Sequence, residues 1–297
     1  MKWLFRANIS QRLRIKLSHS DLQASYIYCA VIPGKTLGIG DQLNLLGVRS
    51  VRLLPLLFYL SLVELYGQST GRMETDRPDQ AECANVVKAG YLQGEFGFNF
   101  NNYGNTQEWD VPTSLIKYGI ANRLELRYVS ILELANGGSS YRPDAAGLKV
   151  FLFPGKKWIP RTTVIGHYHF NDDKRDNSDN NRTHHSVGEL VLTFQNDITE
   201  SFGIGYNFGP EFHSDGTTEW IYRLTPGWNL NSRDFFYAEI FGRVAQGNTQ
   251  VWADAGIARY LNDDLKVDFS AGLNLQQKKQ FYGAIGISWR FKVYNQN

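Results

Sequence analysis

"LKVDFSAGLNLQQKKQFYGAIGISWRF", residues 265–291, alternates apolar and polar side chains in two runs that are joined by a short polar turn. In the first run Leu265, Val267 and Phe269 alternate with Lys266 and Asp268. Successive side chains of a β-strand point to opposite faces, so this period of two predicts a hairpin with one apolar face. A soluble sandwich and a membrane barrel both alternate in this way, so other features of the chain must distinguish them.

The same alternation recurs from about residue 90 onwards, and no helical period of 3.6 residues appears there. Phe96, Phe98 and Phe100, for example, share one face of their segment. We therefore predict an all-β chain, with Pro112, Pro160 and Pro226 marking the least regular strands. The predicted strands are twelve in number, at 90–103, 107–120, 123–134, 145–154, 158–170, 185–198, 201–212, 218–230, 235–245, 249–261, 265–275 and 280–291.

The connections between these strands sort by length. Those after even-numbered strands are tight, whereas "ANGGSSYRPD" after the third strand and "NDDKRDNSDNNRTHH" after the fifth are longer and very polar. Outer-membrane barrels have short periplasmic turns and longer external loops, and a sandwich has no reason to sort its loops in this way. The pattern therefore predicts a transmembrane antiparallel up-and-down β-barrel of about twelve strands, with both ends on the periplasmic side.

Charged residues within the strands mostly lie on the face opposite the Phe, Leu and Ile of the same strand. A charge on the lipid face near the midplane would cost about 2 to 4 kcal/mol, so the charged face is expected to line the lumen. The residues expected to line the lumen are Glu95, Glu125, Arg127, Glu239, Asp254, Asp268 and Arg290. The aromatic residues expected in the two interfacial girdles are Tyr91, Trp109, Tyr118, Trp158, Trp220, Trp228, Tyr260 and Trp289.

The chain of 297 residues has its longest apolar run at "LLPLLFYLSLV", residues 53–63. This run is shorter than the roughly 18 residues of a spanning helix and fits the core of a signal peptide. We expect a signal peptide at 48–67, preceded by an extension, 1–47, that is not a native part of the protein. A cytoplasmic or regulatory extension is the alternative. The remainder is expected to divide into a periplasmic lead-in or small plug at 68–89, the barrel at 90–291 and a tail at 292–297.

Charge and cysteine content exclude two classes of protein. Of the 31 Lys and Arg, eight lie in residues 1–67, as do three of the 29 Asp and Glu, which leaves 23 basic against 26 acidic residues in the remainder. Nucleic-acid binding therefore has no support from composition. Cys83 is the only cysteine after residue 67, so the sequence holds no disulfide framework there.

Several short motifs resemble a known family of outer-membrane transporters, which is grouped under the meta pathway of phenol degradation. The motifs follow one another in order and cover nearly all of residues 74–291. They are "ETDRPDQAE" (74–82), "PTSLIKYGIANRLELR" (112–127), "AGLKVFL" (146–152), "IGYNFG" (204–209), "FFYAEIFG" (235–242), "DAGIARYLNDDLKVDFSAG" (254–272) and "GAIGISWRF" (283–291).

The resemblance implies an outer-membrane location in a Gram-negative bacterium and a transport role, with no substrate assigned. It also implies contact with outer-membrane lipid, and recognition of the last strand by the barrel-assembly machinery through Phe291, although "KVYNQN" follows that residue. The transported solute is expected to be small, and no cofactor or metal is expected.

Mixed charges within a twelve-stranded barrel can line a narrow polar pore or pair with one another and close it. The lead-in residues Thr75, Asp76, Arg77, Pro78 and Asp79 can fold inward as a small plug or remain a solvated segment in the periplasm. Both alternatives for the lumen and both for the lead-in stay open at the level of sequence.

An enzyme in the barrel wall and a structural or adhesive barrel are the rival classes. His167 and His169 share a face of the fifth strand, and His184, His185 and His213 are expected in external loops, where they could bind a metal. No Ser adjoins these histidines in a nucleophile motif, so we expect no catalytic residues.

Overall fold

The computed structural model describes residues 71–135, 138–141, 144–156, 158–170 and 186–293. The expected extension, 1–47, and the expected signal peptide, 48–67, lie outside these residues. Within them, no helix is long and apolar enough to cross a membrane. Every regular element among them is a β-strand.

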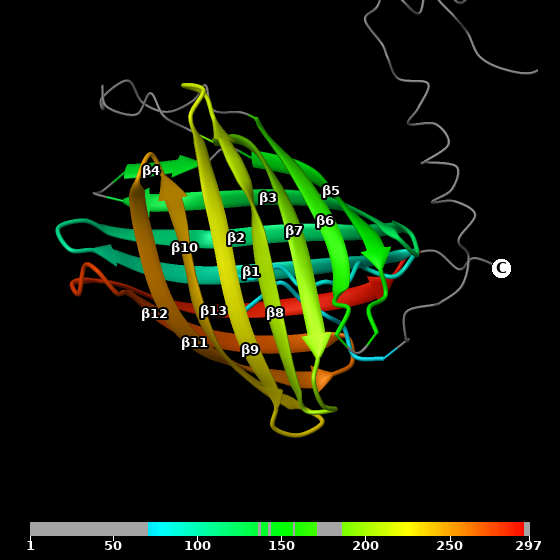
Figure 1. Ribbon diagram of the computed structural model, residues 1–297. Coiled ribbons are helices and arrows are strands. Elements are labelled where there is room, and N and C mark those ends of the chain that lie inside the picture. The colour runs from blue at the N-terminus through cyan, green and yellow to red at the C-terminus, as the bar shows by residue number, and fades with distance from the viewer. Residues whose placement is uncertain (1–70, 136–137, 142–143, 157, 171–185, 294–297) are drawn as a thin grey trace, which may run out of the picture. The chain divides into compact units, whose positions relative to one another are not determined.

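Thirteen antiparallel strands fill the twelve positions of a closed barrel, which Figure 1 shows from the side. The strands are β1 (Tyr91–Tyr103), β2 (Gln107–Ala121), β3 (Leu124–Ala135), β4 (Gly138–Tyr141), β5 (Asp144–Phe153), β6 (Arg161–Phe170), β7 (Ser186–Asp197), β8 (Phe202–His213), β9 (Thr218–Asn229), β10 (Asp234–Ala245), β11 (Asn248–Asn262), β12 (Leu265–Asn274) and β13 (Gln280–Lys292). The short β4 pairs with the end of β3, as β5 pairs with its beginning, so the two occupy one position in the barrel wall.

Closure is made by the first and last strands. β1 pairs with β13 along its whole length, from Tyr91 opposite Lys292 to Tyr103 opposite Gln280. Beyond the last pair, the Val293 amide donates to the Gly90 carbonyl at 2.8 Å. The described chain therefore enters and leaves the barrel at one end, as an even strand count requires. The predicted fold is confirmed, and the pairing of β1 with β13 leaves neither of these two strands with an open edge for lipid to solvate.

The strands alternate between buried and exposed side chains, as the sequence predicts. In β12, Lys266, Asp268 and Ser270 are buried, whereas Phe269, between two of them, is 52% exposed. In a single-walled barrel the buried side chains point inward and the exposed ones outward. Large exposed apolar residues occur on many strands, including Leu148, Leu190, Phe208, Ile240, Ile257, Phe269 and Ile285. Water is a poor solvent for such a surface, and a lipid bilayer is a good one.

Three local predictions need correction. The polar stretch after β3 is partly strand, because residues 138–141 continue the hairpin as β4. The strand expected to begin at 158 begins at Arg161, because Pro160 cannot donate to the ladder and Ile159 pairs with Lys156 in an isolated bridge instead. The described connections at one end of the barrel are not consistently longer than those at the other end, as the sequence analysis predicted they would be. The 171–185 stretch, which was expected to be a long loop, lies outside the described residues.

Two aromatic residues expected in the lipid girdles lie inside the barrel instead. Tyr260 is 6% exposed, its hydroxyl donates to the Met73 carbonyl at 3.2 Å, and the Arg72 guanidinium lies 4.1 Å from its ring centre. Tyr91 shares the inward face of β1 and lies under the guanidinium of Arg290. Position near a strand end does not decide which way a side chain points, whereas strand parity does. Trp109 and Trp220 are exposed, as the prediction requires.

Candidate functional site: a charged lumen and the segment within it

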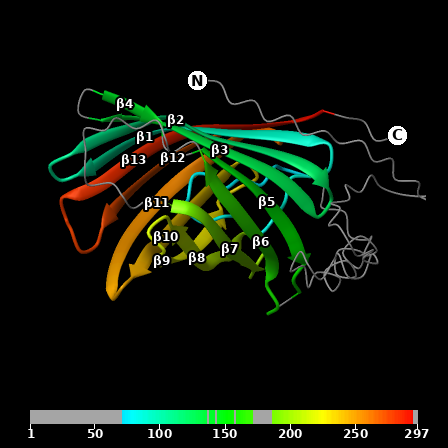
Figure 2. The ribbon, with the colours of Figure 1, turned by 90° about the horizontal axis from the view of Figure 1, so that it is seen from above.

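Residues 71–90, which we call the lumen segment, run inside the barrel before β1 begins. Figure 2 shows this segment, in cyan, within the wall of strands. Met73, Ala84 and Val86 are buried although they belong to no strand. At its start, the segment is held by a hydrogen bond from the Met73 amide to the Asp263 carbonyl at 2.9 Å. The barrel interior therefore holds part of its own chain.

Asp76 is the most heavily contacted residue of the lumen segment. Its Oδ2 lies 2.8 Å from Lys117 Nζ and 3.0 Å from Arg127 Nη1. Its Oδ1 lies 3.3 Å from Lys149 Nζ and accepts from the Cys83 amide at 2.9 Å. Three consecutive strands of the wall, β2, β3 and β5, thus converge on one carboxylate.

Glu82 makes a second attachment near the first. Both of its carboxylate oxygens accept from Arg127 Nη2, at 2.8 and 3.0 Å. Its backbone is paired with Asn207 of β8, because the Glu82 amide donates to Asn207 Oδ1 at 2.6 Å and Asn207 Nδ2 donates to the Glu82 carbonyl at 3.0 Å. Two separate parts of the barrel wall, β3 and β8, therefore hold this part of the segment.

Arg77 binds the wall formed by β1, β12 and β13. Its Nη2 lies 3.0 Å from Asp268 Oδ1. Gly97 and Gly286 are paired across β1 and β13, and a Cβ built on either would come within 2.3 Å of the Arg77 guanidinium. The absence of side chains at these two positions makes the space that the guanidinium occupies. Lys266 contacts the Arg77 carbonyl from β12.

The wall also accepts hydrogen bonds from the backbone of the segment. Glu95 Oε2 accepts from the amides of Asp76 and Arg77, each at 3.0 Å. Glu239 Oε2 accepts from the Gln80 amide at 2.8 Å, and Tyr237 donates its hydroxyl to the Pro78 carbonyl at 3.1 Å. Buried backbone groups must be paired, and here side chains of the wall replace a sheet partner.

The residues predicted to line the lumen are all on inward positions. Glu95, Glu125, Arg127, Glu239, Asp254 and Asp268 are buried, and the first four and Asp268 contact the lumen segment. Arg290 lies at the end where the chain enters the barrel, and it pairs there with Asp264 and donates to the Gly71 carbonyl. Of the residues proposed for the plug, Thr75 accepts from Lys266, Asp76 accepts from Lys117, and the Pro78 carbonyl accepts from Tyr237. Arg77 donates to Asp268, and its carbonyl accepts from Thr75 and Lys266.

Three lysines that hold the segment were left out of the set of residues predicted to line the lumen. Lys117, Lys149 and Lys266 are fully buried, yet none was assigned to the lumen site. A signal was available, because Lys117 is opposite Arg127 in the β2–β3 register and Lys149 is opposite Glu125 in the β3–β5 register. Neighbouring residues that pair across strands face the same side of a sheet.

The lumen segment carries carboxyl groups whose pKa values move in opposite directions. Burial raises the pKa of Asp76, but the charges of Lys117, Lys149 and Arg127 outweigh burial and hold it well below the usual value. Burial and the nearby Glu239 carboxylate raise the pKa of Asp79. Burial also raises the pKa of Glu82, against the attraction of Arg127. Asp76 is thus a firmly charged attachment, whereas burial disfavours the charged form of the other two carboxyl groups.

Space remains beside the segment in the half of the barrel where the chain enters. One cavity of about 400 Å³ is lined by residues that include Arg72, Glu82 and Phe235. Another, of about 490 Å³, is lined by residues that include Arg72, Lys88 and Phe151. Ordinary small-molecule sites have volumes of this order. The interior is therefore partly filled by the segment and partly hollow.

Comparison with known proteins agrees with this architecture. The outer membrane channel from Pseudomonas putida F1 is similar in structure, with a TM-score of 0.51 and 10% sequence identity over 73% of this chain and 100% of that one. The KdgM porin gives a TM-score of 0.49 and 8% identity over 67% of this chain and 99% of that one. At such identities the likeness concerns the fold. No curated protein matches the sequence.

A family model described as "Putative MetA-pathway of phenol degradation" matches residues 75–291, from the lumen segment to the end of the barrel. This range contains every motif on which the resemblance in the sequence rests, apart from Glu74 at the start of the first motif. The expected location is confirmed by the same evidence, since a closed barrel with an apolar exterior is the fold of Gram-negative outer-membrane proteins. The chain therefore belongs to the phenol-degradation MetA-pathway family, as one of its outer-membrane β-barrels.

Proposed function

We propose that this protein is an outer-membrane channel for small polar solutes, and that the lumen segment is a plug that must move before solute passes. The observation that carries the proposal is the seating of residues 71–90 against charged side chains of the inner wall, above all Asp76 against Lys117, Arg127 and Lys149. A route that is blocked by ion pairs can be opened without breaking the barrel.

The polarity of the two faces supports a polar solute. The inner face carries Lys117, Glu125, Arg127 and Lys149, all buried in the barrel, while the outer face is apolar. A polar solute that crosses the hydrocarbon region would lose its hydration, and a charged inner wall replaces those contacts.

The kind of contact supports a movable segment. Outside its ends, the segment joins the wall through side chains rather than through a strand ladder: Val87 N donates to Glu125 at 2.6 Å, Gln80 N to Glu239 and Glu82 N to Asn207. Water can replace an acceptor of this kind at a net cost of about 0.5 to 1.5 kcal/mol for each bond. The twelve-stranded hydrogen-bond network stays whole when the segment leaves.

A structural barrel with a sealed lumen is the second candidate, and the same network favours it. Arg127 alone pairs with Asp76, Glu82 and Glu125, all within 3.0 Å. Removing one partner from a buried ion pair is strongly destabilising, so a network with this many partners can hold a lumen shut permanently.

Two partners follow from the same architecture and are part of the proposal. The exterior side chains contact outer-membrane lipid. β13 forms the closing seam with β1, and its exposed Phe291 is the residue that we expect the barrel-assembly machinery to read. The chain is not proposed to be an enzyme.

Liposome swelling with uncharged sugars of graded size tests the proposal. We expect slow entry of small sugars through the wild-type protein and faster entry through Asp76→Asn, with exclusion of larger sugars in both. If neither protein admits any sugar, the barrel is structural. Release of fatty acid from the same liposomes would instead indicate a hydrolase, which the proposal does not allow. The exposed turn variant Lys278→Gln, between β12 and β13, is the matched control and should behave as wild type.

A further inference from the structure

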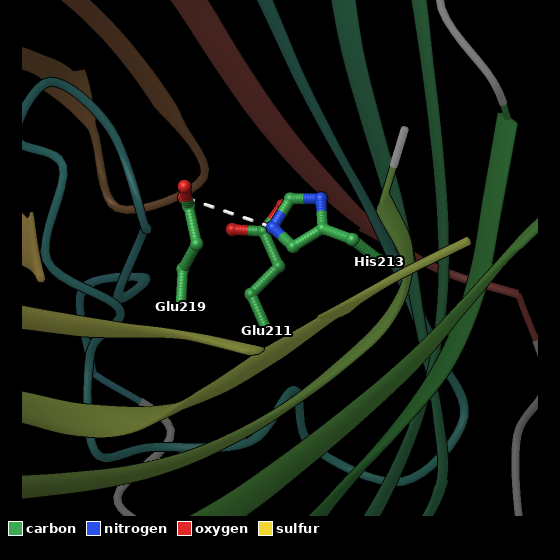
Figure 3. A group of neighbouring side chains, drawn as sticks. All are labelled: Glu211, His213 and Glu219. Carbon is green, nitrogen blue, oxygen red and sulfur yellow. Dashed lines mark ion pairs between the residues drawn. The ribbon is translucent and has the colours of Figure 1, made fainter. Parts of the chain in front are cut away.

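The outer end of the lumen holds a mixed cluster of one histidine and two glutamates, which we call the mouth cluster. It consists of Glu211 and His213 at the end of β8 and Glu219 at the start of β9. Figure 3 shows the three side chains turned toward one another, and one ligand atom from each lies within 4.8 Å of the others. His213, expected in an external loop, is in fact the last residue of β8.

Backbone pairing fixes this geometry. Glu211 and His213 are two residues apart on one strand, so they share the inward face, and Glu219 is directly opposite Glu211 in the β8–β9 register. His213 Nε2 lies 3.6 Å from Glu219 Oε2. Zinc bound by imidazole and carboxylate has bonds of about 2.0 to 2.2 Å, which place neighbouring ligand atoms roughly 3.3 to 3.5 Å apart in a tetrahedral site. Small rotations of the side chains therefore suffice to form such a site.

The surroundings concentrate carboxylates. Glu189 of β7 is directly opposite Glu211, so Glu189, Glu211 and Glu219 form a row across three neighbouring strands. Like charges directly opposite each other destabilise a sheet. Glu189 is partnered by His167, whose Nδ1 lies 2.7 Å from Glu189 Oε1. The other two carboxylates require a cation between them.

A side-chain cation occupies that position. Arg243 Nη1 lies 2.8 Å from Glu211 Oε2 and 3.3 Å from Glu219 Oε2. Unlike the buried cations around Asp76, the Arg243 side chain is 49% exposed and lies near the end of β10. Its long stem lets the guanidinium move into solvent while the two carboxylates stay in place.

We propose that Glu211, His213 and Glu219 form a site for a divalent first-row transition metal such as Zn²⁺, which exchanges with the guanidinium of Arg243. Imidazole together with carboxylate suits Zn²⁺ and its neighbours, whereas Mg²⁺ and Ca²⁺ prefer oxygen ligands alone. Three protein ligands leave a fourth position for water or for a solute. The site lies in the barrel wall and does not depend on whether the barrel conducts.

Isothermal titration of the purified, tag-free protein in detergent with Zn²⁺ tests the site. We expect one equivalent of Zn²⁺ to bind, with affinity reduced at least tenfold in His213→Gln and in Glu219→Gln. Arg243→Ala removes the competing cation and should bind Zn²⁺ at least threefold more tightly. Mg²⁺ and Ca²⁺ should not compete at equal concentration. Circular dichroism and heat-modifiable migration in gels confirm that each variant is folded.

Asp264→Asn provides a matched control, since it removes a carboxylate from the turn between β11 and β12, where Asp264 pairs with Arg290 and not with the mouth cluster. This variant should retain the Zn²⁺ affinity of the wild type. With Co²⁺ as a probe, visible absorption bands from nitrogen and oxygen ligation should appear in wild type and be lost in His213→Gln. The proposal is overturned if wild type binds no Zn²⁺, if His213→Gln binds as wild type does, or if Arg243→Ala binds no more tightly.

Discussion

Asp76→Asn is the substitution that most sharply tests how the lumen segment is held. Asparagine has nearly the same shape, so the change removes the negative charge and leaves the volume intact. The carboxylate that is lost lies 2.8 Å from Lys117, 3.0 Å from Arg127 and 3.3 Å from Lys149. We expect the segment to leave its seat more often, while the barrel itself stays folded.

The free energy that the seated segment loses in Asp76→Asn depends on which other carboxylate partners each cation keeps. Removing one partner of a buried ion pair costs about 3 to 5 kcal/mol when the other is left alone. Here Lys117 keeps its contact with Glu95, and Arg127 keeps Glu82 at 2.8 Å and Glu125 at 3.0 Å. The net loss should therefore be about 1 to 3 kcal/mol, the value of a hydrogen bond to a charged group. The population of the released segment should rise about 5- to 150-fold.

Cys83 is a natural reporter for this release. It belongs to the segment, its Sγ lies 3.6 Å from Lys149 Nζ, and burial followed by the Asp76 charge raises the pKa of its thiol. In a Cys29→Ser background, a maleimide should label Cys83 slowly in the wild type and about 5- to 150-fold faster in Asp76→Asn. Labelling rates measured in urea supply the intrinsic reactivity of each variant.

A control separates release from a direct effect of Asp76 on the thiol. Asp268→Asn breaks the 3.0 Å pair with Arg77 on another wall of the barrel, and Asp268 has no contact with Cys83 among the described bonds. It should also accelerate labelling. Equal rates for wild type and Asp76→Asn, in protein that is still folded, would refute the role given to this carboxylate.

Three further changes test other parts of the structure. Gly97→Val places a side chain where the Arg77 guanidinium lies, since even a Cβ would be 2.3 Å from Nη1. Overpacking of this kind costs roughly 1 to 3 kcal/mol, so the variant should speed Cys83 labelling about tenfold. Because the seated segment raises the pKa of Asp79, protonation stabilises the seat. Sugar flux should fall as pH drops from 7 toward the usual carboxyl value of 3.8, a slope that Asp79→Asn should reduce. Because the pKa of Asp76 is depressed in the seated segment, its carboxylate stabilises the seat fully above pH 3.8. That stabilisation is lost as the pH falls below 3.8, where sugar flux should rise again. Phe269→Lys puts a charge on the lipid face and should lower the free energy of unfolding in lipid by about 2 to 4 kcal/mol, measured by urea titration.

Much of the barrel could be predicted from the alternation of side chains. The period of two placed Phe269 outside and Asp268 inside, and the same reasoning located all twelve strand positions to within about three residues at each end. Parity also put Glu125 and Arg127 on the inner wall. Alternation is a local property of each strand, so it can be read without knowing which strands pair.

The path of the lumen segment could not be predicted in the same way. Residues 71–90 have no period, and Asp76 draws its partners from β2, β3 and β5, which are 41 to 73 residues away along the chain. Tyr260 was misplaced for the related reason that proximity to a strand end was given more weight than parity. The mouth cluster escaped detection because the predicted strand stopped one residue before His213.

Planar-bilayer conductance tests the central claim most directly. The wild-type protein should show mostly closed traces with brief openings, and a variant that lacks residues 71–87 should show steady steps of ion current. Heat-modifiable migration in gels verifies that both barrels are folded. The claim that the lumen segment closes a channel would be contradicted if the folded variant passed no current, or if its current matched that of the intact protein.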